Sequence, residues 1–294
     1  MKGKANLVSD CALAGLIISA IFSSSAQAVE ASPGHLIVIG GGEVPSSIME
    51  RFVDLAGGAG KARIAVIPMA SAAPVESGAA QVEAFKKLGV RDVTALLIPR
   101  ERSSHEGVLG ELDRVTGVFF TGGDQSRLAT NVVGTLAHRK LHELYQRGAV
   151  IGGTSAGAAI MSTVMITGDQ RLHPEAQDGF ATIEKGNAVT AVGLGLITNA
   201  IIDQHFIARK RQNRLFGLVL ENPTLLGIGI DERTAIVARP DGVLEVIGEG
   251  QVMIFDARGI APVKADLKGR LAARNVRAHL LTAGERFDPA SPKN

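Results

Sequence analysis

A serine lies in a glycine-rich pentapeptide that has the composition of a nucleophile turn. The segment Gly153-Thr154-Ser155-Ala156-Gly157 follows an apolar, strand-like stretch and precedes small and apolar residues with the character of a helix. A serine at a sharp strand-to-helix turn adopts a strained conformation that exposes its hydroxyl, while helix N–H groups point toward a developing oxyanion. The pattern predicts that Ser155 attacks a carbonyl group. In the alternative interpretation, Ser155 only caps the helix.

A serine hydroxyl needs a general base, and His205 has the most suggestive setting of the seven histidines. It follows the apolar residues Ile201 and Ile202 in the segment Asp203-Gln204-His205-Phe206. If this stretch is a parallel strand, His205 lies at the carboxyl edge of the sheet, where such sheets place their active groups. A core histidine bonded to the backbone is the alternative.

A histidine pair and a glycine run are two further patterns that can belong to cofactor sites. His138 and His142 have the i, i+4 spacing that can hold a metal ion, but no acid lies between them and no third ligand is evident. A solvated helix face is the preferred interpretation of that pair. The run Gly40-Gly41-Gly42 lacks the spacing of a dinucleotide-binding loop. We therefore expect neither a metal nor another cofactor.

Basic residues follow the histidine motif directly, in the segment Arg209-Lys210-Arg211. Arginine binds carboxylates through two parallel hydrogen bonds, so a substrate that carries carboxylates would fit this position. Taken alone, the segment also fits an ordinary solvated face of a helix.

The elements that must position these residues alternate between strands and helices in the first half of the chain. Strands are expected over residues 35–39, 63–68, 93–98, 117–120 and 149–152, and helices over residues 46–56, 81–88 and 135–147. Such alternation predicts a parallel sheet that is covered by helices on both faces.

The second half of the chain has a different pattern. Residues 163–192 indicate loops with a short hairpin, a buried strand follows over residues 201–203, and a helix over residues 207–220. Four shorter strands then follow, over residues 227–231, 234–238, 243–247 and 252–256. Their turns, at residues 240–242 and 248–250, predict antiparallel hairpins appended to the sheet.

The first 28 residues have the order of a secretory signal peptide. Lys2 and Lys4 precede a short apolar run, residues 11–22, and the segment ends in Ala26-Gln27-Ala28, a pattern typical of a cleavage site. The apolar run is shorter than the about 20 residues that a membrane-spanning helix needs. We expect a signal peptide (1–28), a single α/β domain (29–287), a disordered tail (288–294), and secretion to the periplasm or the medium.

Cleavage after Ala28 would remove Cys11, the one cysteine of the chain, so the mature protein could use neither a disulfide nor a thiol nucleophile. Removing Lys2, Lys4 and Asp10 from 31 basic and 29 acidic residues leaves a formal charge of +1. This balance gives no reason to expect nucleic acid as a partner. The high content of small and apolar residues is typical of a compact enzyme.

Several of these motifs together resemble the cyanophycinases of peptidase family S51, which are serine peptidases related to the aspartyl dipeptidase peptidase E. The three signature blocks correspond in order to Gly122-Gly123-Asp124-Gln125, Gly153-Thr154-Ser155-Ala156-Gly157-Ala158-Ala159 and Asp203-Gln204-His205-Phe206. The match continues into Arg209, Arg211 and Arg214, and into Gly227-Ile228-Gly229-Ile230-Asp231-Glu232. It extends from Gly34 to about Asp256.

The resemblance implies a three-layer α/β sandwich with a mostly parallel sheet, like that of class I glutamine amidotransferases. It also implies hydrolysis of cyanophycin, a polyaspartate backbone with arginine attached through each β-carboxyl, to β-Asp-Arg dipeptides. Members of the family often form dimers, so a homodimer is a further expectation.

The resemblance also assigns roles to single residues. Ser155 would be the nucleophile and His205 its base, with the N–H groups of Gly123 and Ala156 holding the oxyanion. The residues expected to line the substrate site are Gln125, Asp203, Gln204, Arg209 and Arg211. Asp203 is a candidate partner for the substrate guanidinium, while Arg214 lies deeper on the predicted helix and is a candidate structural residue.

The acid that orients His205 is expected between the serine and the histidine, where the family places it. An insertion within residues 167–184 lengthens this interval relative to the family, and Glu184 is the preferred candidate. Glu175 and Asp178 remain open.

Three other functions are compatible with part of this pattern. An aspartyl or isoaspartyl dipeptidase of the peptidase E kind would share the nucleophile, but with a smaller, cytosolic chain. An α/β-hydrolase esterase would share the serine motif, but its histidine usually falls later in the chain. A non-enzymatic protein that binds an acidic ligand would keep the arginines and not depend on Ser155.

Overall fold

The computed structural model describes residues 32–176 and 179–291. The predicted signal peptide (1–28) lies outside these ranges, as do residues 292–294 of the predicted tail, so cleavage and export remain predictions. The described residues fall in one unit by their contacts. Within them, no helix is both long and apolar enough to span a membrane.

The largest sheet has eight strands, in the order β16-β11-β10-β1-β5-β4-β2-β3. Five neighbouring strands are parallel: β1 (Leu36–Ile39), β5 (Val150–Thr154), β4 (Gly117–Phe120), β2 (Arg63–Ile67) and β3 (Asp92–Ala95). Three antiparallel strands extend the sheet beside β1: β10 (Thr234–Ala238), β11 (Leu244–Gly248) and β16 (Arg286–Phe287). The predicted mostly parallel sheet is therefore confirmed.

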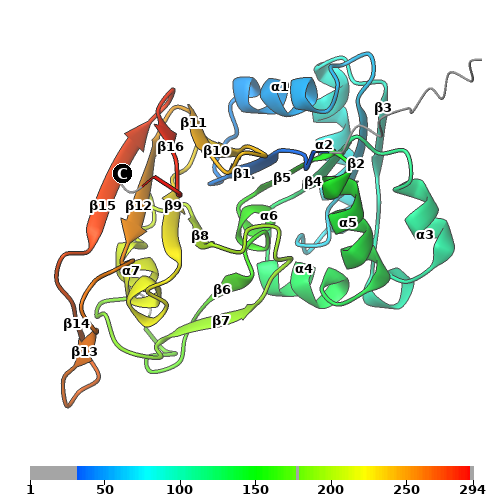
Figure 1. Ribbon diagram of the computed structural model, residues 1–294. Coiled ribbons are helices and arrows are strands. Elements are labelled where there is room, and N and C mark those ends of the chain that lie inside the picture. Colours follow the sequence, from blue (N-terminus) through cyan, green and yellow to red (C-terminus); the bar gives the residue numbers. More distant parts are fainter. Residues whose placement is uncertain (1–31, 177–178, 292–294) are drawn as a thin grey trace, which may run out of the picture. The chain divides into compact units, whose positions relative to one another are not determined.

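Helices cover both faces of this sheet (Figure 1). One face carries α1 (Ser46–Leu55) and α2 (Pro74–Lys87). The other carries α3 (Glu106–Glu111), α4 (Gln125–Val132), α5 (Leu136–Gln146) and the short α6 (Ala156–Ala159), with a 3-10 turn, η1 (Arg100–Arg102), before α3. Strand β1 is buried on both sides: Leu36 and Val38 join one apolar core, and Ile37 and Ile39 join the other. An uninterrupted apolar strand is what such a central position requires.

A second sheet contains β8 (Ala200–Gln204), β9 (Leu226–Ile230), β12 (Gln251–Asp256) and β15 (Arg277–Thr282). Helix α7 (Gln212–Glu221) packs on it through Leu215, Leu218 and Val219. The predicted C-terminal hairpins therefore extend the main sheet only through β10 and β11, because β9 and β12 pair in the second sheet instead. An apolar strand pattern shows burial but does not identify the pairing partner.

Two small hairpins complete the fold. β6 (Val164–Gln170) and β7 (Ala188–Val192) form the hairpin that was predicted within residues 163–192. Their register shifts between Ile166 and Gln170. The other hairpin joins β13 (Lys264–Ala265) and β14 (Leu271–Ala272).

The helix after the histidine motif begins later than predicted, at Gln212 instead of residue 207. The intervening segment is a turn in which Lys210 has a φ of 52°. The Asp231 carboxylate accepts hydrogen bonds from the N–H groups of Ile207 and Ala208. This acid follows β9, so the turn depends on a contact between segments far apart in the sequence.

Gly152 in β5 makes room for an aromatic cluster, and its replacement is expected to destabilise the fold. Phe52, Phe85 and Phe119 have ring centroids 5.4–5.5 Å apart. A Cβ at position 152 would lie 2.7 Å from a ring carbon of Phe52. We expect Gly152→Ala to lower the free energy of unfolding by about 1–3 kcal/mol, the usual cost of overpacking, as measured by urea denaturation.

Gly110→Ala in α3 is the matched control, because a Cβ there meets no atom within 4 Å. Alanine favours a helix over glycine by up to about 1 kcal/mol, so this variant should be as stable as the original chain or more stable. Equal effects of the two substitutions would contradict the packing argument.

Candidate active site

Ser155 lies at the turn between β5 and α6, with φ of 54° and ψ of −110°. This conformation is strained for a residue with a side chain, and the glycines on either side are needed to form the turn. A Cβ on Gly157 would lie 2.5 Å from the carbonyl oxygen of Phe120, and one on Gly153 would lie 2.5 Å from that of Gly157. The sharp strand-to-helix turn predicted from the sequence is thus present.

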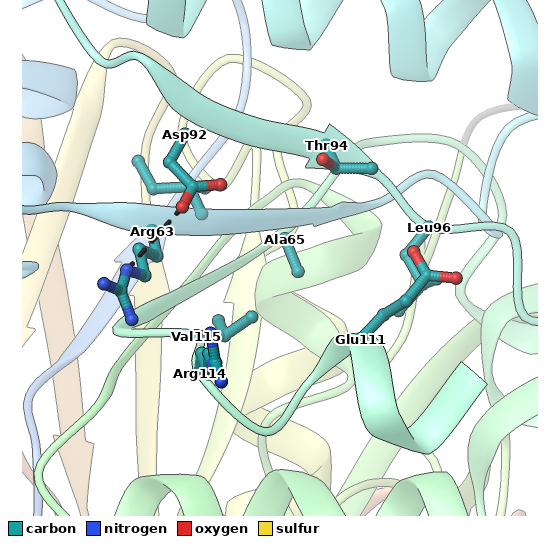
Figure 2. Close-up of a pocket in the computed structure, with 9 residues that line it drawn as sticks. Arg63, Ala65, Asp92, Thr94, Leu96, Glu111, Arg114 and Val115 are labelled. Atoms are coloured by element: carbon teal, nitrogen blue, oxygen red, sulfur yellow. Dashed lines mark ion pairs between the residues drawn. The ribbon is translucent and has the colours of Figure 1, made fainter. Parts of the chain in front are cut away.

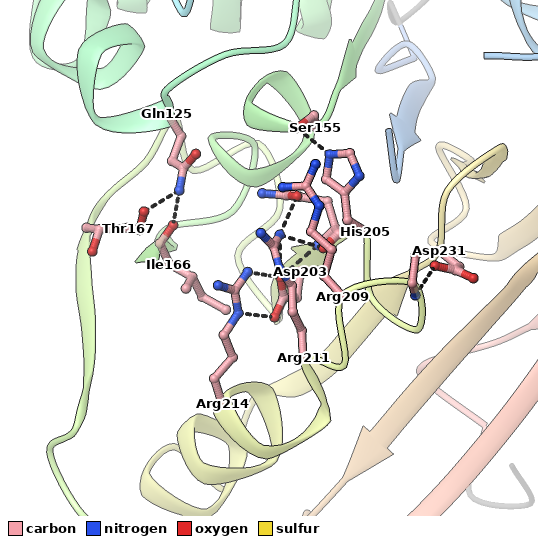
Figure 3. A network of polar contacts seen from close by, with 12 residues as sticks. Gln125, Ser155, Ile166, Thr167, Asp203, His205, Arg209, Arg211, Arg214 and Asp231 are labelled. Atoms are coloured by element: carbon pink, nitrogen blue, oxygen red, sulfur yellow. Dashed lines mark hydrogen bonds and ion pairs between the residues drawn. The ribbon is translucent and has the colours of Figure 1, made fainter. Parts of the chain in front are cut away.

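The serine contacts a histidine that in turn contacts an acid. Ser155 Oγ lies 2.8 Å from His205 Nε2. Figure 3 marks this contact with a dashed line. His205 Nδ1 lies 2.6 Å from Glu232 Oε1. The side chain of His205 is only 7% exposed, whereas that of Glu232 is 35% exposed. A hydroxyl, an imidazole and a carboxylate in this sequence of contacts can activate the hydroxyl as a nucleophile.

The end of β1 holds the backbone of all three groups in place. Three successive carbonyls, those of residues 39, 40 and 41, accept hydrogen bonds from N–H groups. In that order, the donors are Ser155 (2.9 Å), His205 (2.7 Å) and Arg233 (2.9 Å). Arg233 directly follows Glu232. Three successive peptide groups therefore align residues that are far apart in the sequence.

Close packing explains the glycines that follow β1. A Cβ on Gly41 would lie 2.3 Å from Cε1 of His205, and one on Gly40 would lie 2.0 Å from the carbonyl oxygen of Asp231. The residue spacing argues against a dinucleotide-binding loop at this position, but it does not indicate a packing role. The role of these glycines is to let the backbone approach the histidine and the segment that carries the acid.

Glu184, the acid preferred from the sequence, does not contact His205. Its carboxylate lies 2.6 Å from Nε2 of His173 instead. Of the two open alternatives, Glu175 is exposed and Asp178 lies outside the described residues. The prediction of Glu184 is therefore not supported by the geometry.

Strand pairing explains why Glu232 takes this position. β8 and β9 run parallel with Gln204 opposite Ile230, so the segments that follow the two strands lie side by side. His205 directly follows β8, and Glu232 closely follows β9. Glu232 ends one of the motif blocks that carry the family resemblance, but it follows the histidine, whereas the resemblance implies an acid before it.

The surroundings of His205 lower its pKa. Burial is the largest cause, and the positive charges of Arg209 and Arg211 act in the same direction, while the hydrogen bond to Glu232 opposes the shift. The imidazole is therefore neutral near pH 7, the form that can accept a proton from Ser155.

The loop after β4 lies beside the serine. A Cβ on Gly122 would lie 3.5 Å from that of Ser155. Gly123 has a φ of 140°, and a Cβ there would lie 2.2 Å from the carbonyl oxygen of Ala70. Asp124 begins α4 by accepting hydrogen bonds from the N–H groups of two following residues. The two predicted oxyanion donors, Gly123 and Ala156, therefore lie on the two segments next to the nucleophile.

Gln125, predicted to line the substrate site, binds the protein itself. Its Nε2 donates to the carbonyls of Ile166 (3.0 Å) and Thr167 (2.5 Å) in β6. The side chain thereby joins α4 to the β6–β7 hairpin (Figure 3).

Asp203 is buried and paired, which leaves no room for the predicted contact with a substrate guanidinium. Its two carboxylate oxygens accept hydrogen bonds from Nε (2.7 Å) and Nη2 (2.5 Å) of Arg214. Asp203 is 1% and Arg214 6% exposed. Arg214 is therefore structural, as its place on the helix indicated.

The two other arginines of the motif differ in their surroundings. Arg211 donates through Nη1 to the backbone oxygen (2.7 Å) and the side-chain oxygen (2.6 Å) of Gln204. Burial, together with the nearby charge of Arg214, lowers the pKa of Arg211 to about 10. Arg209 is mostly exposed, and its Nε lies 3.9 Å from Glu232.

A cavity of about 700 Å³ lies next to these residues. Arg209, Arg211 and Arg214 line one side, and residues of β6 and of the loop after it line the other. A smaller cavity, of about 180 Å³, lies where β2 and β3 begin, beside the ion pair of Arg63 and Asp92 (Figure 2). It opens at the amino ends of these strands, whereas Ser155 follows the carboxyl end of β5, so it is not part of the site.

The sequence suggests a solvated helix face for His138 and His142, but both side chains contact the protein. Nε2 of each ring contacts the carbonyl oxygen of Leu194, at 2.8 Å and 2.6 Å. Throughout the described ranges, no three His, Cys, Asp or Glu side chains gather in a way that could hold a metal ion.

Solved structures share this fold. A peptidase from an acI-B1 actinobacterium aligns with a TM-score of 0.62 and 25% identity, over 88% of this chain and 98% of that one. A putative peptidase E protein from Listeria monocytogenes EGD-e aligns with a TM-score of 0.51 and 19% identity, over 74% of this chain and 98% of that one.

Curated relatives are more similar in sequence. The cyanophycinase of Synechococcus elongatus is 35% identical over 264 residues, which cover 87% of this chain and 79% of the relative. The cyanophycinase of Geminocystis herdmanii is 36% identical over 263 residues, 86% of this chain and 93% of the relative. The model of peptidase family S51 matches residues 36–246. The chain is therefore a peptidase that belongs to family S51.

Proposed function

We propose that the protein hydrolyses cyanophycin to β-Asp-Arg dipeptides through Ser155, His205 and Glu232. The observation that carries the proposal is the series of contacts from the Ser155 hydroxyl to His205 and on to Glu232. The choice of substrate is supported by the curated relatives, which are cyanophycinases and align over most of their length.

In the first half of the reaction, Ser155 Oγ attacks the carbonyl carbon of a backbone peptide bond, and His205 Nε2 takes the hydroxyl proton. Glu232 stabilises the imidazolium that forms. The N–H groups of Gly123 and Ala156 hold the oxyanion of the tetrahedral intermediate. Collapse of the intermediate breaks the C–N bond, His205 gives its proton to the leaving amine, and an ester of Ser155 remains.

In the second half, water attacks the ester carbonyl and His205 takes a proton from the water. The second tetrahedral intermediate collapses to a carboxylic acid, and the proton on His205 returns to Ser155 Oγ. The enzyme is then back in its starting state, and one water has been consumed for each bond broken.

The cations beside the nucleophile match the charge of this substrate. An arginine that is linked through its amino group keeps a free carboxylate at every residue of the polymer. Arg209 and Arg211 lie next to His205 and can attract these carboxylates.

If residues 1–28 direct export, the substrate would be polymer released by other cells. The proposal thus assigns the enzyme to the use of external cyanophycin, in contrast to an enzyme that consumes its own cell's reserve.

The substrate and the nucleophile can be tested together. We expect the purified protein to release soluble β-Asp-Arg from insoluble cyanophycin, measured by mass spectrometry. Ser155→Ala should lower this rate by about 10⁴-fold or more, as loss of a serine nucleophile does elsewhere. Absence of release by the folded, unsubstituted protein would reject cyanophycin as the substrate and favour short aspartyl peptides.

The acid can be identified by comparing two isosteric variants. Glu232→Gln removes the charge that stabilises the His205 imidazolium, so kcat should fall by about 10²–10⁴-fold. Glu184→Gln should leave kcat within about threefold, because Glu184 contacts His173 and not His205. The reverse result would restore the acid predicted from the sequence.

The lowered pKa of His205 predicts the acid limb of the pH profile. Protonated His205 cannot act as a base, so kcat/KM should fall as the pH decreases through the pKa of the free enzyme. Because that pKa is lowered, the midpoint should lie below about 6.5, the usual value for histidine. A midpoint above that value would show that Glu232 outweighs burial.

A further inference from the structure

The cavity of about 700 Å³ beside Arg209 and Arg211 is lined by charges of both signs in unequal number. Among the described residues that line it, Arg209, Lys210, Arg211 and Arg214 are cations, and Asp169 of β6 is the one carboxylate. An acid that lines a basic cavity ordinarily pairs with one of its cations. Asp169 does not.

Within the described ranges, the Asp169 carboxylate has one hydrogen-bond partner, and this partner is neutral. Thr167 Oγ1 donates to Asp169 Oδ2 at 2.9 Å. Across the described part of the chain, no Lys, Arg or His nitrogen lies within 4.0 Å of this carboxylate. Two of the cations bind elsewhere, Arg214 to Asp203 and Arg211 to Gln204. The charge of Asp169 therefore remains available to a ligand.

The fold supplies a specific support for this acid. The register of the β6–β7 hairpin shifts between Ile166 and Gln170, and Gly168, directly before Asp169, has a φ of 109°. Such irregularities redirect side chains next to functional sites. Gln125 fixes the start of this segment through its hydrogen bonds to the carbonyls of Ile166 and Thr167. The cavity wall that carries Asp169 is thus tied to α4, which begins beside the oxyanion loop.

We infer that Asp169 binds the guanidinium group of the substrate, an inference that rests on the proposed function. Each residue of the polymer carries a free carboxylate and a guanidinium on the same arginine. A binding site must therefore offer a cation and an anion within one cavity. Arg209, Lys210 and Arg211 supply the positive side, and Asp169 supplies the negative side.

The burial of Asp203 argues against this residue, the candidate from the sequence, as the partner of the substrate guanidinium. Asp203 is almost fully buried and holds Arg214 with both oxygens, so a substrate guanidinium would have to displace a protein guanidinium. Asp169 is exposed at the cavity wall and needs no such exchange. Selectivity for arginine-bearing substrate thus resides in the β6–β7 hairpin.

The test compares two soluble oligomers that differ in one charge per repeating unit. The first is an oligomer of β-Asp-Arg, and the second carries citrulline, a neutral isostere, in place of arginine. Asp169→Asn should lower kcat/KM for the arginine oligomer by about 10- to 100-fold, the range expected for loss of a charge-assisted hydrogen bond. For the citrulline oligomer, kcat/KM should change by less than about threefold, because no guanidinium is present to lose its partner.

Two control variants separate binding from structure. Asp169→Glu keeps the charge and should retain most of the preference for arginine. Glu175→Gln removes a charge from the segment after β6, at an exposed position that is not among the residues that line the cavity. This variant should change neither rate. Equal losses on both oligomers with Asp169→Asn, or no loss on either, would overturn the inference.

Binding measurements keep this test independent of the proposed function. In a Ser155→Ala background, the affinity for each oligomer is measured by calorimetry with and without Asp169→Asn. If the unsubstituted enzyme cleaved neither oligomer, the proposed function would fail. An arginine preference in binding that disappears with Asp169→Asn would still support the inference, and equal binding of both oligomers to Ser155→Ala would refute it.

Discussion

The site depends on the end of strand β1, where three successive carbonyls receive the N–H groups of Ser155, His205 and Arg233. These peptide groups join the main sheet, which carries the serine, to the loops that follow β8 and β9 in the second sheet. Hydrogen bonds of this kind align the three residues only if the backbones approach closely. Gly40 and Gly41 permit that approach, since a Cβ at either position would overlap with the opposing segment. The relative placement of the hydroxyl, imidazole and carboxylate follows from this junction.

A second constraint is the buried pair of Asp203 and Arg214, which organises the charges around the cavity. Removing one partner of a buried pair typically costs about 3–5 kcal/mol, because the other charge is left without compensation. Arg214 is held by this pair, and Arg211 is held by Gln204, next to it in β8. The rigid cations on this side and the acid carried by the β6–β7 hairpin on the other give the cavity its polarity.

The parallel sheet, the strained serine turn and the contact between Ser155 and His205 could be predicted, because each is expressed in a short, continuous pattern of residue types. Glu232 could not be found this way, since it meets His205 only through the pairing of β8 with β9. For the same reason the sequence indicates Asp203 as a partner for the substrate, although the structure pairs it with Arg214. Its residue type indicates a charge near the site, but only the packing of α7 on the second sheet shows that Arg214 already neutralises it. Residues 177–178, which include the candidate Asp178, lie outside the described ranges.

The position of β1 in the sheet has a consequence for how the enzyme matures. β1 pairs with β10 as well as with β5, and Leu36 lies opposite Ala238, about two hundred residues later in the chain. Glu232 lies two residues before that partner strand, so we expect the carboxylate to reach the histidine only when the last part of the sheet has formed. Contacts of such long sequence separation form late in folding. A nascent or truncated chain that lacks the last part of the sheet can therefore contain the serine turn without the contact between His205 and Glu232.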